Sequence, residues 1–111
     1  MDMALYRARL EEELETLSRD SAGAKEGRAP VELDQQSVGR LSRMDALQVQ
    51  AMAQETERRR QTRMEVVRAA LKRMDAGEFG ACLTCGEDIA VKRLELDPAT
   101  ATCIDCAGRA G

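Results

Sequence analysis

Cys82-Leu-Thr-Cys85 and Cys103-Ile-Asp-Cys106 are the stretches that decide the fold of the C-terminal part of this 111-residue chain. They contain all four cysteines of the sequence, and 17 residues separate the two pairs. Two C-x2-C knuckles separated by roughly 15–20 residues are typical of a four-thiolate zinc site. Because the protein fills all four positions of the tetrahedron, we expect one structural Zn²⁺ and no open site for a substrate. The expected ligands are Cys82, Cys85, Cys103 and Cys106. Two disulfides in a secreted domain, or a redox switch, are the alternatives for the same residues.

The composition favours long exposed helices over a thick globular core. The chain has one Phe, one Tyr and no Trp, and 33% of its residues are charged. A formal net charge of −3 does not suit a protein that holds nucleic acid electrostatically. Histidine, the commonest general acid or base, does not occur in the sequence. We therefore expect a protein that is not an enzyme.

The sequence also predicts a cytoplasmic protein that is not inserted in a membrane. It contains no run of about 18 apolar residues, the length that suggests a membrane span. The segment Met1-Asp-Met-Ala-Leu-Tyr-Arg7 lacks the basic and apolar regions of a signal peptide. Paired cysteines in an unexported protein hold a metal more often than they form disulfides.

Two amphipathic helices are predicted before the cysteines, over residues 2–22 and 44–76, with a loop or tip over residues 23–43. The apolar stripe of the first helix is Tyr6, Leu10, Leu14 and Leu17. The second helix has an early apolar face at Met44, Leu47 and Ala51, and a late one at Met64, Val67, Leu71 and Met74. Gly77 marks the end of this second helix.

Opposite charges favour an antiparallel pairing of these helices. Residues 2–20 carry a net charge of −3, whereas residues 55–73 carry seven Lys or Arg against three Glu, a net charge of +4. In such a hairpin the late stripe of the second helix faces Tyr6 and Leu10. The basic residues either pair with the acidic first helix or meet an acidic or phosphate surface of a partner. They are Arg58, Arg59, Arg60 and Arg63.

The expected fold class is mainly α. An antiparallel two-helix coiled-coil hairpin over residues 1–76 is followed by a small C-terminal four-cysteine zinc-finger module over residues 77–111. Phe79, the only Phe, is expected between the module and the base of the hairpin. An intramolecular hairpin needs no second chain, so we expect a monomer.

The residues around the cysteines resemble one family in particular. Gly77-Glu-Phe-Gly-Ala-Cys82-Leu-Thr-Cys85-Gly86, then Arg93-Leu94, then Cys103-Ile-Asp-Cys106, look like the zinc finger of the DksA/TraR family of bacterial transcription factors. The resemblance implies a protein that binds RNA polymerase, rather than specific DNA sequences. Its hairpin would enter the secondary channel of the polymerase and alter the stability of initiation complexes. The alarmone ppGpp strengthens this effect in several members and is a candidate effector.

The tip departs from that family, whose better-known members carry Asp-x-x-Asp-x-Ala there. This chain has no such acidic pair near Gly39-Arg-Leu-Ser-Arg-Met44, which makes it similar to a shorter branch. The candidate polymerase contacts are Asp34, Arg40, Arg43, Asp45, Ala46, Lys92 and Arg93. Asp45 could instead serve only the dipole of its helix, and Lys92 and Arg93 could serve only to neutralise a Zn(Cys)4 centre.

Two other classes of function compete with transcription control. A zinc ribbon that binds DNA or RNA would need cations or stacking aromatic residues, but residues 82–111 carry five acidic against three basic residues and no aromatic one. A thiol redox sensor would lose its zinc when the cysteines are oxidised.

Overall fold

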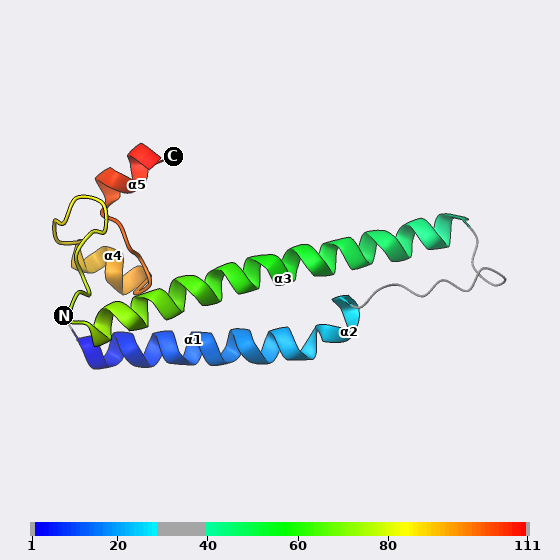
Figure 1. Cartoon of the computed structure of the whole chain (residues 1–111), viewed down its shortest axis with the longest axis horizontal. Coiled ribbons are helices and arrows are strands. Elements are labelled where there is room, and N and C mark those ends of the chain that lie inside the picture. Colours follow the sequence, from blue (N-terminus) through cyan, green and yellow to red (C-terminus); the bar gives the residue numbers. More distant parts are fainter. Residues whose placement is uncertain (1, 29–39, 111) are drawn as a thin grey trace.

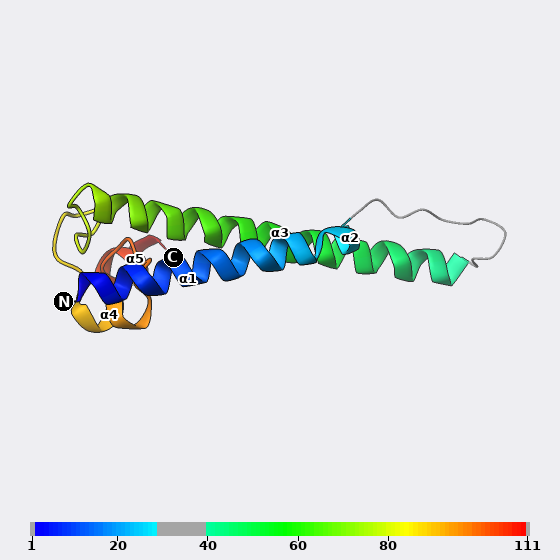
Figure 2. The same ribbon diagram turned by 90° about the horizontal axis from the view of Figure 1, so that it is seen from below.

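The protein is mainly helical, as the sequence predicts. The computed structural model describes residues 2–28 and 40–110. The helices are α1 (Met3–Gly23), α2 (Lys25–Arg28), α3 (Arg40–Asp75), α4 (Val91–Leu96) and α5 (Ile104–Ala110). Figure 1 and Figure 2 show α1 and α3 side by side, with α4 and α5 gathered at one end of the pair. The expected class, a helical hairpin with a C-terminal four-cysteine module, is confirmed.

Extended backbone pairs at one place in the described residues, an isolated antiparallel bridge between Ala81 and Asp88. None of the helices in these two ranges combines the length and the apolar character needed to cross a membrane.

The helices differ slightly from their predicted bounds. α3 begins at Arg40, four residues before the expected start, and has 36 residues. The last glycine before it is Gly39, and Arg-Leu-Ser-Arg after that glycine contains no helix breaker. Within the expected loop, Lys25–Arg28 form the short α2. At the other end of α3, Gly77 adopts a positive φ of 73°, which is the conformation that glycine commonly supplies just past a helix.

The buried and half-buried positions of α3 follow a heptad pattern along the helix, and its C-terminal half packs against α1. Met64, Val67 and Met74 are buried and Leu71 is half-buried, which confirms the predicted late stripe. Counting back from Met64 by alternating steps of four and three, the half-buried positions are 60, 57, 53, 50, 46 and 43. This spacing is that of a coiled-coil seam.

The predicted early apolar face is wrong. Met44, Leu47 and Ala51 are exposed, with exposed fractions of 56% and 48% for the first two. The heptad that starts at the base of the hairpin places the seam one residue earlier, at positions 43, 46 and 50. Apolar character along the sequence therefore does not mark the seam in the distal part of α3.

One apolar core joins the hairpin to the C-terminal module. Its centre is formed by Leu10 of α1, Val67 of α3 and Leu94 of α4, each at most 1% exposed. The other buried members are Tyr6, Ala70, Met74, Cys82, Ile89, Ala99 and Cys106. The late stripe of α3 thus meets Tyr6 and Leu10, as predicted. The predicted boundary between residues 76 and 77 runs through this shared core and stays a prediction.

Phe79 packs where the sequence analysis places it. It is half-buried against the shared core, and its ring centroid lies 6.0 Å from that of Tyr6 with a tilt of 46°. This separation is within the range of favourable aromatic pairs. The only Tyr and the only Phe of the chain therefore meet at the base of the hairpin.

Candidate metal centre and the residues around it

The first cysteine knuckle is a tight loop closed by backbone hydrogen bonds. The N–H of Cys82 donates to the carbonyl of Glu87 at 2.8 Å, and the N–H of Gly86 donates to the carbonyl of Cys82 at 2.9 Å. Gly86 has a φ of 79°, in the left-handed region that a residue with a side chain rarely adopts. The loop therefore turns sharply enough to bring the sulfurs of Cys82 and Cys85 together.

The second knuckle starts α5 and is tied to the first. The N–H of Ala107 donates to the carbonyl of Cys103 at 3.0 Å, so the knuckle is the first turn of a helix. The N–H of Leu83 donates to the carbonyl of Ala101 at 2.9 Å, which links the two knuckles. The backbone therefore fixes the four cysteines relative to one another.

The four sulfur atoms have the spacing of a tetrahedral metal site. All four lie within 4.8 Å of one another, and the sulfurs of Cys85 and Cys103 are 3.7 Å apart. Zn–S bonds of about 2.3 Å around a tetrahedron place neighbouring sulfurs about 3.8 Å apart. The cysteines are free thiols, not disulfides. These residues therefore fit Zn²⁺ bound by four thiolates.

The pKa values of the clustered thiols also favour the binding of a cation. Backbone N–H groups of Cys103 and Cys85 lower the pKa of the Cys82 thiol to about 6. The neighbouring thiols of Cys103 and Cys85, followed by burial, raise the pKa of Cys106 to about 12. Four thiolates at this distance repel one another, and a shared cation removes that repulsion. A bound Zn²⁺ would cross-link the two knuckles and hold the module together.

Lys92 and Arg93 lie beside this centre, as their place in the sequence suggested. Both line a groove with Cys85 and Cys103 on the surface of the module. Arg93 is half-buried and its Nε donates to the carbonyl of Thr102 at 3.0 Å, whereas Lys92 is exposed. Both basic residues therefore line the same groove as two of the four cysteines.

The candidate contacts at the tip do not join this centre. Arg43, Asp45 and Ala46 belong to the first two turns of α3, at the end opposite the module (Figure 1). Asp45 is exposed, and Arg43 and Ala46 are half-buried. Asp34 and the side chain of Arg40 lie outside the described residues. The candidate contacts are thus separated into a distal group and a group beside the cysteines.

The basic residues of α3 mostly pair within their own helix. Arg58 and Arg59 both form ion pairs with Glu55, and Nε of Arg59 lies 3.4 Å from the Glu55 carboxylate. Arg60 pairs with Glu57 at 2.6 Å. The predicted pairing with the acidic first helix is realised by Arg63, which contacts Glu13 at 2.8 Å.

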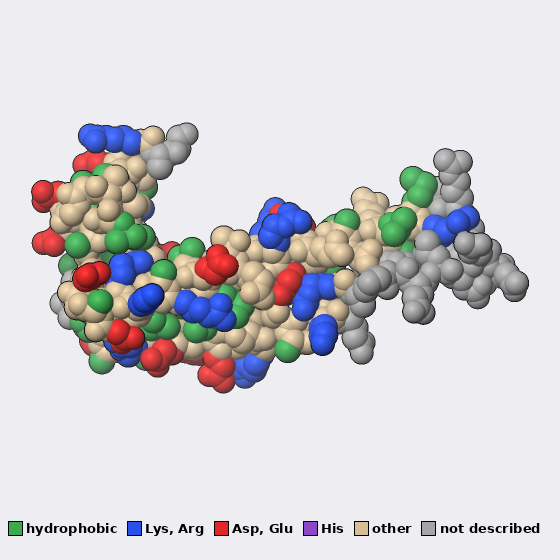
Figure 3. All heavy atoms as spheres, viewed as in Figure 1, with side chains coloured by type: hydrophobic (Ala, Val, Ile, Leu, Met, Phe, Trp, Pro, Cys, Tyr) green, Lys and Arg blue, Asp and Glu red, His purple; other side chains and the backbone are tan. Residues whose placement is uncertain are grey.

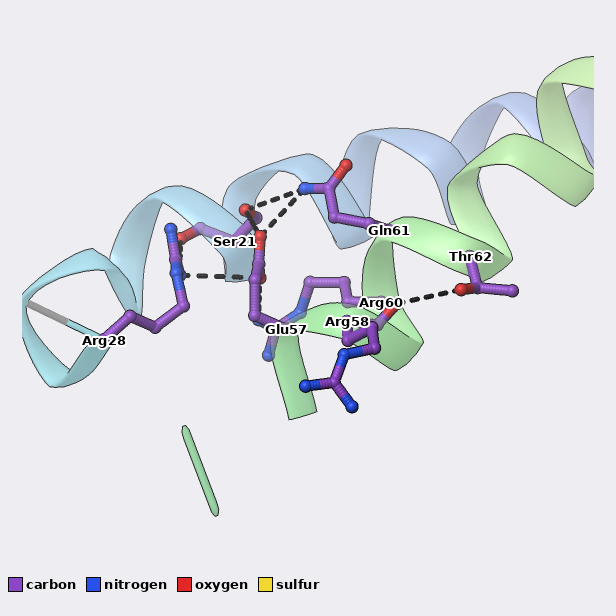
Figure 4. Close-up of polar contacts among 7 residues, drawn as sticks. All are labelled: Ser21, Arg28, Glu57, Arg58, Arg60, Gln61 and Thr62. Carbon is purple, nitrogen blue, oxygen red and sulfur yellow. Dashed lines mark hydrogen bonds and ion pairs between the residues drawn. The ribbon is translucent and has the colours of Figure 1, made fainter. Parts of the chain in front are cut away.

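A polar cluster that the sequence analysis missed sits in the seam of the hairpin. Figure 4 shows Ser21 pointing toward Glu57 and Gln61 of α3, and Arg28 pointing toward Glu57. The hydroxyl of Ser21 donates to Glu57 at 2.5 Å, Gln61 donates to it at 2.8 Å, and Arg28 lies 3.4 Å from it. The Ser21 hydroxyl and the Gln61 amide, followed by Arg60 and Arg28, lower the pKa of Glu57 to about 2.

This cluster predicts an acid dependence of stability. Because the pKa of Glu57 returns to about 4.5 on unfolding, its contribution is complete above that pH and is lost as the pH falls toward 2. We expect the difference in unfolding midpoint between the wild type and Glu57→Gln to narrow as the pH falls through this window. Chemical unfolding followed by circular dichroism at each pH measures it.

Acid also protonates thiolates, so each variant is compared with the wild type at the same pH. The matched control is Glu55→Gln, because the side chain of Glu55 is 44% exposed, against 14% for Glu57, and pairs only with Arg58 and Arg59 in the described residues. If the difference in unfolding midpoint between the wild type and Glu57→Gln stays constant from neutral pH down to about pH 2, this account of Glu57 is wrong.

The signals for Glu57 and Arg63 in the sequence were weak. A charged residue at a seam position is visible only once the heptad is known, because the seam in this part of α3 carries Glu57 and Arg60 in place of apolar residues. The basic patch was visible, but its partners were not, since Glu13 lies 50 residues before Arg63.

Comparison with known proteins agrees with this geometry. Residues 77–110 match the family described as the prokaryotic dksA/traR C4-type zinc finger. Among solved structures, transcription factor DksA2 from Pseudomonas aeruginosa superposes with a TM-score of 0.76 at 21% identity, covering 97% of this chain and 84% of that one. That likeness establishes the shared fold.

Two curated relatives match over a shorter region. A protein of Haemophilus influenzae named RNA polymerase-binding transcription factor DksA is 46% identical over 43 residues, which are 39% of this chain and 30% of that protein. The Escherichia coli protein of the same name is 40% identical over 40 residues, 36% of this chain and 26% of that protein. The chain therefore matches less than a third of the length of either relative.

Proposed function

We propose that this chain is a transcription modulator that binds RNA polymerase, because its residues 77–110 match the dksA/traR C4-type zinc finger. The hairpin would enter the secondary channel of the enzyme and alter the stability of initiation complexes. The observation that carries the proposal is the joint presence of a dksA/traR finger and a DksA2-like hairpin in one chain. Two relatives that share the finger are named for binding RNA polymerase.

The length of α3 supports an inserted arm. Its 36 residues extend about 54 Å at the rise of an α-helix. Figure 1 shows the distal end of α3 extending past α2, away from the module. A slender helical arm of this kind suits a narrow channel better than a flat surface.

The distal half of α3 also exposes several large apolar side chains, and Figure 3 shows hydrophobic side chains on the surface near that end of the molecule. They are Met44, Leu47, Val49 and Met52, with exposed fractions between 48% and 64%. Clustered exposed apolar residues mark interaction surfaces, and methionine adapts to irregular partners. We propose that this part of the arm contacts the polymerase together with Asp34, Arg40, Arg43, Asp45 and Ala46.

The zinc module would hold the base of the arm outside the channel. We propose that Cys82, Cys85, Cys103 and Cys106 bind one structural Zn²⁺, and that residues 77–111 act as a docking unit behind the hairpin of residues 1–76. Lys92 and Arg93, beside the thiolates, are candidates for contact with the polymerase rim or with ppGpp. Because the usual acidic pair at the tip is missing, we propose that this protein keeps its binding to the polymerase while its effect on transcription is altered.

The remaining features of the proposal follow from this mode of action. The protein would work in the cytoplasm as a monomer, by binding and without catalysis. It would reach promoters through the polymerase and would not recognise DNA sequence itself. Net negative charge on the zinc module is consistent with a protein partner.

The proposal is tested by competition for purified bacterial RNA polymerase. Zinc-loaded protein, labelled at its N-terminus, is bound to the polymerase and then challenged with a known secondary-channel factor. We expect displacement at stoichiometric excess of the competitor, with and without ppGpp. A rise in affinity with ppGpp would identify it as an effector.

A variant of the exposed distal arm tests whether this part of α3 contacts the polymerase. Met52→Glu places a charge on an exposed apolar position and leaves the shared core untouched, so it should weaken binding and leave helix content unchanged. Binding that survives a saturating competitor, or no binding by a protein with zinc and helix intact, would overturn the proposed secondary-channel mode.

A further inference from the structure

Arg63 joins three parts of the molecule through a single guanidinium group. Its Nε and Nη2 donate to the two carboxylate oxygens of Glu13 in α1, at 2.8 and 3.0 Å. Its Nη1 and Nη2 donate to the two oxygens of Asp97, directly after α4, at 3.1 and 2.9 Å. Arg63 itself belongs to α3, so both helices of the hairpin and the zinc module meet at this side chain.

Asp97 is held in place to receive these bonds. It caps the C-terminal end of α4, where its backbone N–H donates to the carbonyl of Arg93 at 3.0 Å. Its Oδ1 also accepts a hydrogen bond of 3.0 Å from the backbone N–H of Ala99. The position of the Asp97 carboxylate is therefore fixed relative to the backbone of the module.

A second contact fixes the same edge of the module. Nη1 of Arg9 in α1 donates to the backbone carbonyl of Glu95 in α4 at 2.7 Å. Arg9 and Arg63 thus hold the last turn of α4 from two different helices. Beneath them, Leu10 and Leu94 are fully buried in the shared core.

The apolar core and the arginine–carboxylate pairs constrain the module in different ways. Apolar burial is non-directional, so the shared core that contains Leu10 and Leu94 holds the module against the hairpin but allows it to rotate. A bidentate arginine–carboxylate pair has a fixed planar geometry, and two such pairs on one guanidinium define an angle. The side chains of Arg63, Glu13 and Asp97 are between 32% and 40% exposed, so their contribution to stability is modest.

We propose that Arg63 is a positioning residue that sets the angle between the zinc module and the helical hairpin. The purpose of that angle rests on the proposed function: an arm in a channel and a module outside it must both fit one polymerase. The angle itself is a property of the isolated protein and is measured without the polymerase.

The test measures orientation directly. Residual dipolar couplings of the zinc-loaded protein are collected for amides of α1 and α3 and separately for amides of residues 80–106. In the wild type we expect a single alignment tensor to fit both sets. In Arg63→Gln and in Asp97→Asn we expect two tensors and about tenfold faster hydrogen exchange in α4.

Three further variants separate positioning from general destabilisation. Arg59→Gln makes the same change in charge on the same helix, at a side chain that is 81% exposed and pairs with Glu55, and it should keep one tensor. Arg63→Lys keeps the charge without the planar fork and should rescue the angle only in part. Leu94→Val loosens the core while the ion pairs remain, and should lower stability with one tensor retained.

The outcomes decide both proposals independently. One tensor in Arg63→Gln and Asp97→Asn, with zinc content and helix content unchanged, would overturn the positioning role whatever the polymerase result. Two tensors in these variants, with no polymerase binding by the wild type, would keep the positioning role and remove its proposed purpose. Two tensors with polymerase affinity reduced at least fivefold relative to Arg59→Gln would support both.

Discussion

Cys82→Ser is expected to unfold the zinc module and release its metal. A serine hydroxyl stays protonated at neutral pH and cannot replace a thiolate on Zn²⁺. Structural zinc contributes about 10–16 kcal/mol to the folding of small modules, which is as large as the whole stability of an ordinary domain. Because Cys82 and Cys106 also belong to the shared core, we expect the base of the hairpin to loosen as well.

Metal analysis and amide NMR spectra of the purified protein measure this effect. We expect the bound zinc to fall from one equivalent to near zero, and the signals of residues 80–106 to collapse to random-coil positions. Leu83→Ala is the matched control, because Leu83 is the next residue and its side chain is 64% exposed. A Cys82→Ser protein that unfolds cooperatively without zinc, from a dispersed spectrum, would show that the metal is dispensable.

Leu10→Ala is expected to have the second-largest effect. Leu10 is 1% exposed and sits where α1, α3 and α4 meet. Truncating a buried leucine to alanine costs about 2–5 kcal/mol, through lost burial and the cavity left behind. For a chain of this size we expect the melting temperature of the zinc-loaded protein to fall by roughly 10 °C or more.

Thermal unfolding followed by circular dichroism measures the loss. Leu5→Ala is the control on the same helix, since Leu5 is 53% exposed and should change stability by no more than about 0.5 kcal/mol. Equal melting temperatures for Leu5→Ala and Leu10→Ala would mean that the module does not depend on the hairpin for its packing.

The local features of the fold could be predicted from the sequence because each rests on a short pattern. The cysteine spacing indicates a four-sulfur cluster, and the periodicity of Tyr6, Leu10 and Leu14 indicates the buried stripe of the first helix. Gly77 marks the end of α3 because a left-handed residue is needed there. In each case the physical cause lies within a few residues of its effect.

The distal seam could not be predicted, because apolar residues are poor guides there. Met44 and Leu47 look like core positions but lie one residue away from the heptad that Met64 and Val67 establish. Further along the same seam lie Glu57 and Arg60, which are half-buried and charged. Glu57 accepts hydrogen bonds from Ser21 and Arg60 and forms an ion pair with Arg28, and these contacts offset the burial. Such compensation depends on the partner helix and leaves no periodic signal in α3 alone.

The angle between module and hairpin was also beyond sequence reasoning. It depends on Arg63 meeting carboxylates that lie 50 residues before it and 34 residues after it. The basic stretch of α3 offers several arginines, and nothing in their spacing distinguishes the one that bridges three elements from its neighbours that pair locally.

The buried Tyr6 gives this protein a natural optical probe. It is the only tyrosine of a chain without tryptophan, it is 3% exposed, and it touches the ring of Phe79 at the junction of hairpin and module. All intrinsic tyrosine fluorescence therefore comes from that junction, whereas far-ultraviolet dichroism averages over every helix. Unfolding curves from the two signals will coincide where the molecule melts as one unit and will separate where the distal arm frays first.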